Sequence, residues 1–139
     1  MEKTYQEVAD YYDKIWNDLE QESKTGVLSR HRMILLKLKQ AGFNSKSTLL
    51  EIGCGIGTLS SYLAKTNIDG KVDAVDISPA TIEFAKNKYK GLKNLEFFVS
   101  DMTDFSIDKK YDFILFPDVL EHIPVEAHEN IFNTIKNFC

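Results

Sequence analysis

Cysteine is scarce in this chain, and so is proline. The 139 residues include two cysteines, Cys54 and Cys139, and three prolines. Two cysteines are too few for the disulfide scaffold of a small secreted domain, and their separation matches no zinc-ligand spacing. We therefore expect a reduced protein with a cytoplasmic location.

An excess of positive charge and long apolar runs are also missing. The chain has 17 basic and 21 acidic side chains, a net charge of −4. Tight non-specific binding to nucleic acid depends on clustered Lys and Arg, so no nucleic-acid partner is expected. No apolar run approaches the roughly 18 residues of a spanning helix, and the first residues lack the pattern of a secretion signal. We expect no membrane partner.

The residues that are present describe one domain over 1–139. At 43% apolar residues, a chain of this size can bury roughly two-thirds of its unfolded surface. We expect an N-terminal helical cap over residues 1–44 and an α/β core over residues 45–139. Two apolar stripes at helical spacing predict the helices of the cap, and the second stripe ends near Gly42. The stripes comprise Tyr5, Val8, Ala9, Tyr12, Ile15, Trp16 and Leu19, and then Val27, His31, Ile34, Leu35 and Leu38.

Short apolar strands alternate with helical segments from residue 48 onward. Helices are predicted after a glycine turn, after the Ser78-Pro79 start signal and after Pro124. Strands separated by helices form βαβ units, which predict a doubly wound, mostly parallel sheet with helices on both faces. The predicted strands cover residues 48–52, 72–77, 95–99 and 111–116.

Polar residues follow each predicted strand at the end where ligands bind in such sheets. Parallel strands are buried on both faces, so acidic groups at their tips have no evident structural task. The sequence therefore predicts a ligand site at this edge. The groups in question are Glu51 with three glycines, Asp76, Asp101, and Asp118 with Glu121-His122.

The glycine turn admits two interpretations. A dinucleotide fingerprint has the form G-x-G-x-x-G, whereas the chain reads Gly53-x-Gly55-x-Gly57, with Glu51 just upstream. A buried or half-buried carboxylate beside the turn would repel a pyrophosphate, but it would suit a cationic ligand such as an ammonium group. Asp76 can accept both hydroxyls of a ribose in either case. Asp101 is placed to accept from an exocyclic amine, or else it caps the following turn.

The segment from Leu49 to about Pro124 resembles the class I S-adenosylmethionine-dependent methyltransferases, and its Asp118-Val119-Leu120-Glu121-His122-Ile123 stretch resembles their small-molecule branch. The resemblance implies a Rossmann-like fold, S-adenosylmethionine as cofactor and S-adenosylhomocysteine as product. It implies that the glycine turn approaches the methionine part, that Asp76 holds the ribose, and that Asp101 with Met102 holds adenine. The full set of expected cofactor residues is Glu51, Gly53, Cys54, Gly55, Gly57, Asp76, Ile77, Asp101, Met102, Phe116, Tyr12 and Arg32, although Tyr12 is equally suited to the core.

Little side-chain chemistry is obligatory for methyl transfer, because a sulfonium methyl is already activated. A hydroxyl or ammonium acceptor must still lose a proton, and His122 has the unperturbed pKa best suited to a general base, with Asp118 next. A packing role for His122 is the open alternative. The Glu and His residues from 121 to 128 lack the spacing of a metal site, so we expect no metal.

Three hypotheses follow. The first is methyl transfer to an oxygen or nitrogen of a small molecule, the second is a cofactor-binding module without turnover, and the third is an NAD-type oxidoreductase. The family's sheet has seven strands, so we expect the C-terminal strands to be missing from this chain. That would leave the outer edge of the strand at 111–116 unpaired, and exposed strand edges invite association. We therefore expect self-association through that edge or through the last helix.

Overall fold

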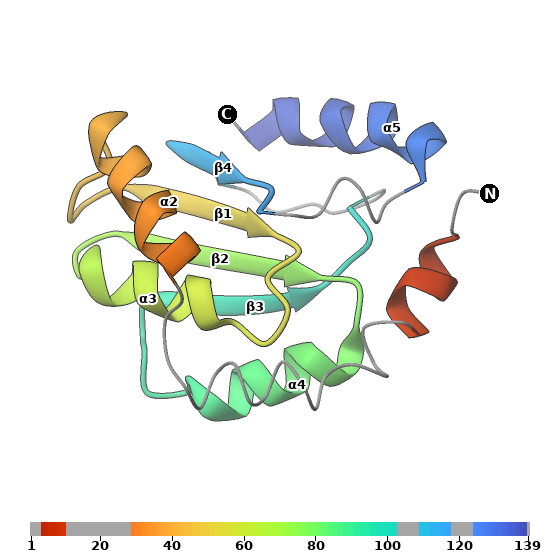
Figure 1. The fold of residues 1–139 in the computed structure, drawn as a ribbon, viewed down its shortest axis with the longest axis horizontal. Helices are drawn as coiled ribbons and strands as arrows, with labels where there is room; N and C mark the ends of the chain where they lie inside the picture. Colours follow the sequence, from red (N-terminus) through yellow and green to blue (C-terminus); the bar gives the residue numbers. More distant parts are fainter. Residues whose placement is uncertain (1–3, 11–28, 103–108, 118–123, 139) are drawn as a thin grey trace.

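A four-stranded parallel sheet lies at the centre of the computed structural model, which describes residues 4–10, 29–102, 109–117 and 124–138. The strand order is β3-β2-β1-β4, so the order reverses at β1. This is the doubly wound arrangement that the alternation of strands and helices predicts, and it is drawn in Figure 1. The strands are β1 (Thr48–Ile52), β2 (Lys71–Asp76), β3 (Leu95–Val99) and β4 (Phe113–Leu115).

The first three strands match the predicted ranges to within one residue, but the predicted fourth strand is too long. β4 covers three residues in place of the predicted 111–116. Tyr111 does not extend the ladder, because its N–H donates to the Phe138 carbonyl oxygen at 2.6 Å. The sheet register is in place only from Phe113, which lies opposite Leu49.

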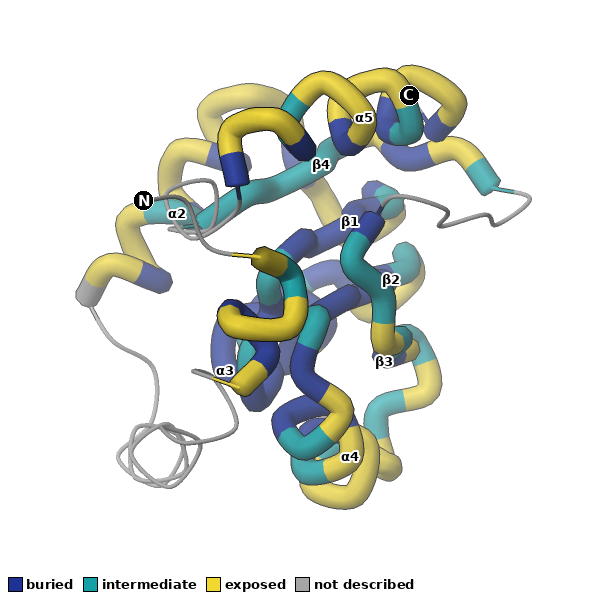
Figure 2. Tube along the Cα trace, turned by 90° about the vertical axis from the view of Figure 1, so that its right-hand side faces the viewer, coloured by how far each residue is buried: buried dark blue, intermediate teal, exposed yellow. Residues whose placement is uncertain are grey.

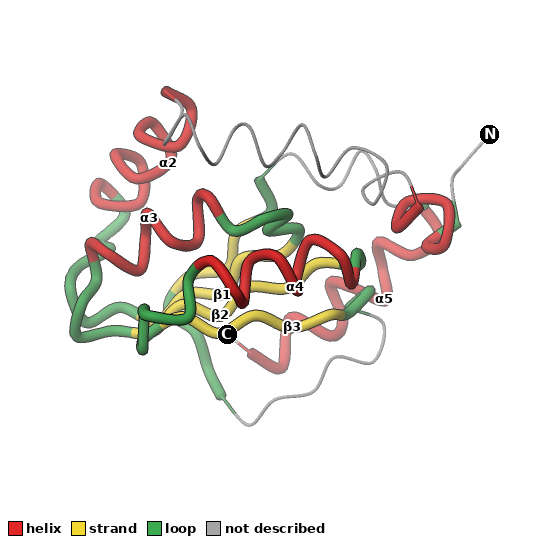
Figure 3. The backbone as a smooth tube through the Cα atoms, turned by 90° about the horizontal axis from the view of Figure 1, so that it is seen from below, coloured by secondary structure: helices red, strands yellow, loops and turns green. Residues whose placement is uncertain are grey.

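Helices cover both faces of the sheet, as Figures 1 and 3 show. One face packs against α2 (Ser29–Gln40), α3 (Thr58–Thr66) and α4 (Pro79–Lys88). The other face packs against α5 (Val125–Ile135) and the short 3₁₀ helix η2 (Lys136–Phe138). Alternate residues of β1 supply the two cores: Leu49 faces the first group and Leu50 the second, and both are fully buried.

Residues 5–10 form a helix that packs onto the body of the protein. Val8 and Ala9, both on the predicted apolar stripe, are buried. Figure 1 places this helix at the end of the sheet toward which the strand arrows point, and Figure 2 views the molecule from that end, with β4 in the teal of half-buried residues. None of the described helices has the length and apolar character needed to cross a membrane.

Candidate functional site

The glycine turn after β1 has a backbone that favours glycine at three positions. Gly53, Gly55 and Gly57 have φ angles of 80°, 56° and 86°, in the left-handed region where side chains are strained. The N–H groups of Gly53 and Cys54 both donate to the Val75 carbonyl oxygen, at 2.8 and 3.0 Å, and hold the turn against β2. A Cβ on Gly57 would lie 2.8 Å from the Phe97 ring, so close packing also requires a glycine there.

Asp76, the last residue of β2, fixes the turn from the other side. One carboxylate oxygen accepts from the Gly55 N–H at 2.9 Å and the other from the Ser78 N–H at 3.0 Å. Burial raises the pKa of Asp76, and these backbone hydrogen bonds oppose the rise. Each oxygen of a carboxylate has two acceptor positions, so Asp76 can also accept from the hydroxyls of a ribose.

Glu51 is a buried carboxyl group beside the turn, as the sequence predicts. It is 2% exposed, and the Ser60 hydroxyl donates to it at 2.7 Å. Burial raises its pKa to about 8; the Ser60 hydrogen bond opposes this rise, and the nearby charge of Asp76 adds to it. Burial likewise raises the pKa of the Cys54 thiol. A positively charged ligand group at this position would favour the ionised form of Glu51.

The end of β3 lies next to the end of β2. The Ser100 N–H donates to the Asp76 carbonyl oxygen at 3.0 Å. This hydrogen bond brings Asp101 alongside Asp76, the residue predicted to bind a ribose. Met102 is buried with a φ of 67°, unusual for a residue other than glycine, and its N–H donates to the Ser100 hydroxyl at 2.9 Å. Ile77 and Asp101 are half-buried at this edge.

Helix α3 begins at the turn without a side-chain cap. Its first residue, Thr58, is buried, and the Thr58 hydroxyl has no hydrogen-bond partner among the described residues. A buried hydroxyl without a partner is uncommon, and here it lies beside an uncapped helix N-terminus. Together with Glu51 and Asp76, these groups fit a ligand that carries an amino acid at one end and a nucleoside at the other.

The structure does not bring every predicted residue to the turn. Phe116 follows β4, with its ring centroid 5.8 Å from that of Phe132 on α5. Arg32 is exposed on α2, so its contact with the cofactor stays a prediction. The predicted Tyr12, Asp118 and His122 lie outside the described residues. Among the described residues, no group of three His, Cys, Asp or Glu side chains could hold a metal ion.

The sequence reasoning missed a buried polar cluster below α5. Asp73, in the middle of β2, is fully buried, and the Tyr111 hydroxyl donates to it at 2.5 Å. Lys109 donates to the same oxygen at 3.0 Å. Burial and then Asp73 raise the pKa of Tyr111. An acidic residue inside the apolar stretch of β2 was the available signal, but its partners are more than 30 residues away along the chain.

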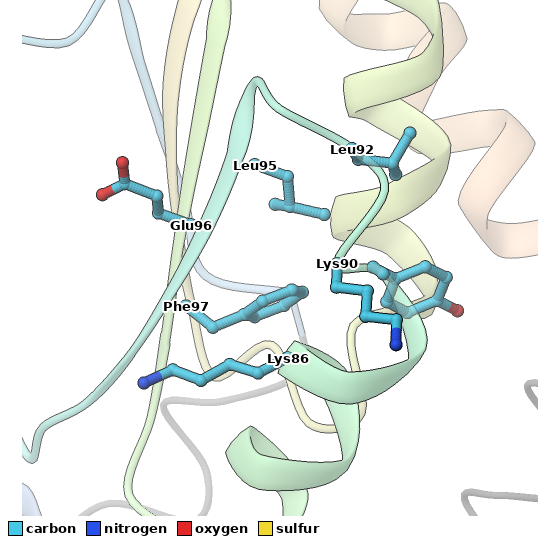
Figure 4. Close-up of a pocket in the computed structure, with 7 residues that line it drawn as sticks. Lys86, Lys90, Leu92, Leu95, Glu96 and Phe97 are labelled. Atoms are coloured by element: carbon cyan, nitrogen blue, oxygen red, sulfur yellow. The ribbon is translucent and has the colours of Figure 1, made fainter.

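A shallow hollow of about 300 Å³ lies between the end of α4 and the start of β3 (Figure 4). Two of its lining rings, Tyr89 and Phe97, also limit the space at Gly57. Glu96 points away from the hollow in Figure 4 and pairs with Lys71 at 2.8 Å. None of the acidic residues at the strand ends lines the hollow, although Phe97 lies close to both the hollow and Gly57.

A parallel sheet with a glycine turn after β1 and a carboxylate at the tip of β2 defines a Rossmann-like nucleoside-binding domain. Comparison with known families agrees with this class. The family model described as "Methyltransferase domain" matches residues 49–139, more than half of the chain. The chain therefore belongs to the methyltransferase-domain family.

Individual relatives agree with that assignment. Malonyl-acyl-carrier-protein O-methyltransferase 1 of Ilyobacter polytropus is 37% identical over 87 residues, which cover 63% of this chain and 32% of that protein. The crystal structure of coclaurine N-methyltransferase with N-methylheliamine and S-adenosylhomocysteine is 26% identical, with a TM-score of 0.66 over 77% of this chain and 32% of that one. The structure of the cyclase SpnF has a TM-score of 0.80 over 96% of this chain and 56% of that one, but at 17% identity this likeness shows the fold alone. The chain spans about a third of the length of the first two proteins.

Proposed function

We propose that this chain binds S-adenosylmethionine at the carboxyl end of its sheet and takes part in methyl transfer to an oxygen or nitrogen of a small molecule. The observation that carries the proposal is the glycine turn with the buried Glu51 just before it and with Asp76 bonded to its Gly55 N–H. It combines a buried acidic group for an ammonium with a fixed carboxylate for a ribose. A pyrophosphate would bring negative charge beside Glu51 and oppose its ionisation, which disfavours the NAD-type alternative.

Each residue at the site has a proposed task. The backbone of Gly53, Cys54 and Gly55 lies against the methionyl part of the cofactor, and Glu51 faces its ammonium group. Asp76 accepts from the ribose hydroxyls, and Asp101 accepts from the adenine amino group. Three further residues complete the proposed set: Ile77 and Met102 beside the base, and Phe116 beside the sulfonium.

The bound cofactor supplies a methyl group that is already activated by a positively charged sulfur. The protein then has to align the acceptor and exclude water, which can lower a barrier by roughly 7–11 kcal/mol. A hydroxyl or ammonium acceptor must also lose a proton. We propose His122 as the base that takes this proton, with Asp118 as the second candidate; both lie outside the described residues.

The acceptor class rests on composition and on the relatives. Two of the relatives described above are named as an O-methyltransferase and an N-methyltransferase, so either atom can receive the methyl group within this family. The net charge of −4 gives no basic surface for nucleic acid. We propose a small-molecule acceptor, and a cytoplasmic location because Cys54 is a free, buried thiol.

A cofactor-binding module without turnover is the second candidate function. We keep it because one fold can carry different functions, and because the chain spans about a third of the length of the two methyltransferases described above. A panel of amine, hydroxyl and carboxyl acceptors distinguishes the two. Release of S-adenosylhomocysteine with any acceptor supports methyl transfer, whereas cofactor binding without release across the panel supports the module.

Calorimetry with S-adenosylhomocysteine and NAD tests the proposed cofactor. We expect micromolar binding of the former and none of the latter. D76N should weaken binding roughly 10- to 100-fold, because it removes charge-assisted hydrogen bonds to ribose. D69N, at an exposed aspartate before β2, is the matched control and should bind like the wild type. Thermal unfolding of both variants separates lost binding from lost folding, and absent binding by a folded wild-type chain would refute the proposal.

A further inference from the structure

The hollow between α4 and β3 has no part in the proposed function, and its floor is apolar and aromatic. Leu95 and Phe97, on β3, are buried at this floor, and Tyr89 and Leu92 are half-buried. The Tyr89 and Phe97 rings are stacked, with an interplanar angle of 28° and centroids 6.3 Å apart. Aromatic rings pack well against other flat rings. The floor of the hollow therefore suits a ligand with an aromatic ring system.

Positive charge surrounds this floor. Lys86, in the last turn of α4, and Lys90, just beyond the helix, line the hollow, and both are exposed. Figure 4 shows their side chains around the Phe97 ring. Neither ammonium group has an ion-pair partner among the described residues. A third ammonium group, that of Lys88, lies 5.7 Å from the centroid of the Tyr89 ring. The charges at the hollow therefore favour an anion.

The acidic residue of the lining does not neutralise these lysines. Glu96 points away from the hollow in Figure 4, and its carboxylate accepts from the Lys71 ammonium group at 2.8 Å. The hydrogen bond from Lys71 lowers the pKa of Glu96, so this carboxylate stays ionised beside Lys71. A lysine in the last turn of a helix also balances the helix dipole, which gives Lys86 a second task. Lys90 follows the C-cap residue of α4 and lies outside the helix.

We propose that this hollow is a second binding site, for a small aromatic carboxylate. The ring system of the ligand lies on the Tyr89 and Phe97 side chains, and its carboxylate accepts from the Lys86 and Lys90 ammonium groups. The volume of about 300 Å³ is at the lower end of the range for ligand pockets, which suits one small molecule. None of the described cofactor candidates lines the hollow, so the inference is independent of the proposed function.

Three probes separate the two parts of the site in NMR titrations of the whole chain. Naphthoate has a ring system and a carboxylate, naphthalenemethanol has the ring system without the charge, and acetate has the carboxylate without the rings. We expect naphthoate to bind with a Kd of roughly 0.1–1 mM, because the site is shallow. The alcohol should bind roughly 3- to 20-fold more weakly, and acetate should not bind measurably. Naphthoate should shift the amide signals of Leu92, Leu95 and Phe97.

Replacing both lysines tests the contact with the carboxylate. The double variant K86Q and K90Q should weaken naphthoate binding roughly 3- to 20-fold and change binding of the alcohol less than twofold. The alcohol thus reports whether the hollow is still folded. The double variant K37Q and K39Q is the matched control, because it removes two exposed lysines from the last turn of α2 and changes the net charge equally. It should leave both affinities unchanged.

Several results would overturn the proposal. Equal affinities for naphthoate and the alcohol would show that the lysines bind no anion, and acetate binding as tight as naphthoate binding would show that the rings contribute nothing. Equal losses in the two double variants would show an effect of net charge alone. Amide shifts confined to the glycine turn and Asp76 would place naphthoate at the proposed cofactor site. Absence of naphthoate binding to the folded wild-type chain would also overturn it.

Discussion

The β1–β2 part of the sheet is more deeply buried than the β4 strand. Four of the five residues of β1 are buried, whereas all three residues of β4 are half-buried. The glycine turn is held by three backbone N–H groups that bond to Val75 and Asp76. β4 pairs with β1 on one side and with no described strand on the other. The glycine turn is therefore fixed by the backbone itself, while β4 depends on a few side-chain and terminal contacts.

Replacing Gly57 by alanine is expected to destabilise the glycine turn, in the more tightly packed of the two regions. It should have the largest effect on stability. The new Cβ would lie 2.8 Å from the Phe97 ring on a backbone with φ of 86°. We expect the free energy of unfolding in urea to fall by about 2–4 kcal/mol. Gly91→Ala is the control, because nothing lies within 4 Å of its Cβ, and it should change stability by about 0.5 kcal/mol or less. Equal effects of the two variants would contradict this account.

The next test concerns the hydrogen bond from Tyr111, just before β4, to Asp73 in β2. Tyr111→Phe removes the donor to Asp73, which stays buried with Lys109 as its remaining described partner. We expect a loss of about 1–3 kcal/mol in unfolding free energy, because a buried carboxylate loses a hydrogen bond. Y62F serves as the control, and a loss no greater than in that variant would show that the cluster does not stabilise β4.

The pH dependence of stability sharpens the description of the glycine turn. Glu51 has an ordinary pKa of 4.5 and a folded pKa of about 8, so the folded state retains its proton while the unfolded chain is ionised. The stability this proton provides is complete below about pH 4.5 and is lost as the pH rises through about 8. Between these values the unfolding free energy should fall by at most about 1.4 kcal/mol per pH unit more in the wild type than in E51Q. Parallel pH profiles of the two proteins would contradict the assignment.

Self-association on the side of β4 that has no described partner strand is the smallest expected effect. The predicted routes are the edge of β4 and the last helix, α5; on that helix Ile131 and Ile135 are buried against the sheet. Phe132 on α5 is 44% exposed and lies beside Phe116, which follows β4. We expect light scattering to show weak association at high concentration and less of it in F132K. I68K, at an exposed loop residue, is the control, and a strictly monomeric wild type would refute association.

Local patterns predicted the elements well. The apolar run of 48–52 and the Ser78-Pro79 start signal gave the bounds of β1 and the start of α4, because each depends on neighbouring residues alone. The glycines and acidic strand ends likewise predicted the turn and the burial of Glu51. The positions of three catalytic or cofactor candidates, Tyr12, Asp118 and His122, stay predictions.

Contacts between distant segments were not predictable in the same way. Asp73 meets Tyr111 only because the strand order places β4 beside β1 and one strand from β2. The start of β4 was mispredicted for a related reason, since the Tyr111 N–H bonds to Phe138 of η2 in place of the sheet.

The buried carboxyl group of Glu51 has a consequence for calorimetry. At neutral pH a Glu51 that is still protonated would transfer its proton to the buffer when a ligand ammonium group comes to lie against it. The measured enthalpy would then include the buffer's own heat of protonation. Titrations in phosphate and in Tris, which differ greatly in that heat, should give different enthalpies for the wild type and matching ones for E51Q. The number of protons released per ligand bound would thus report directly whether a ligand ammonium group lies against Glu51.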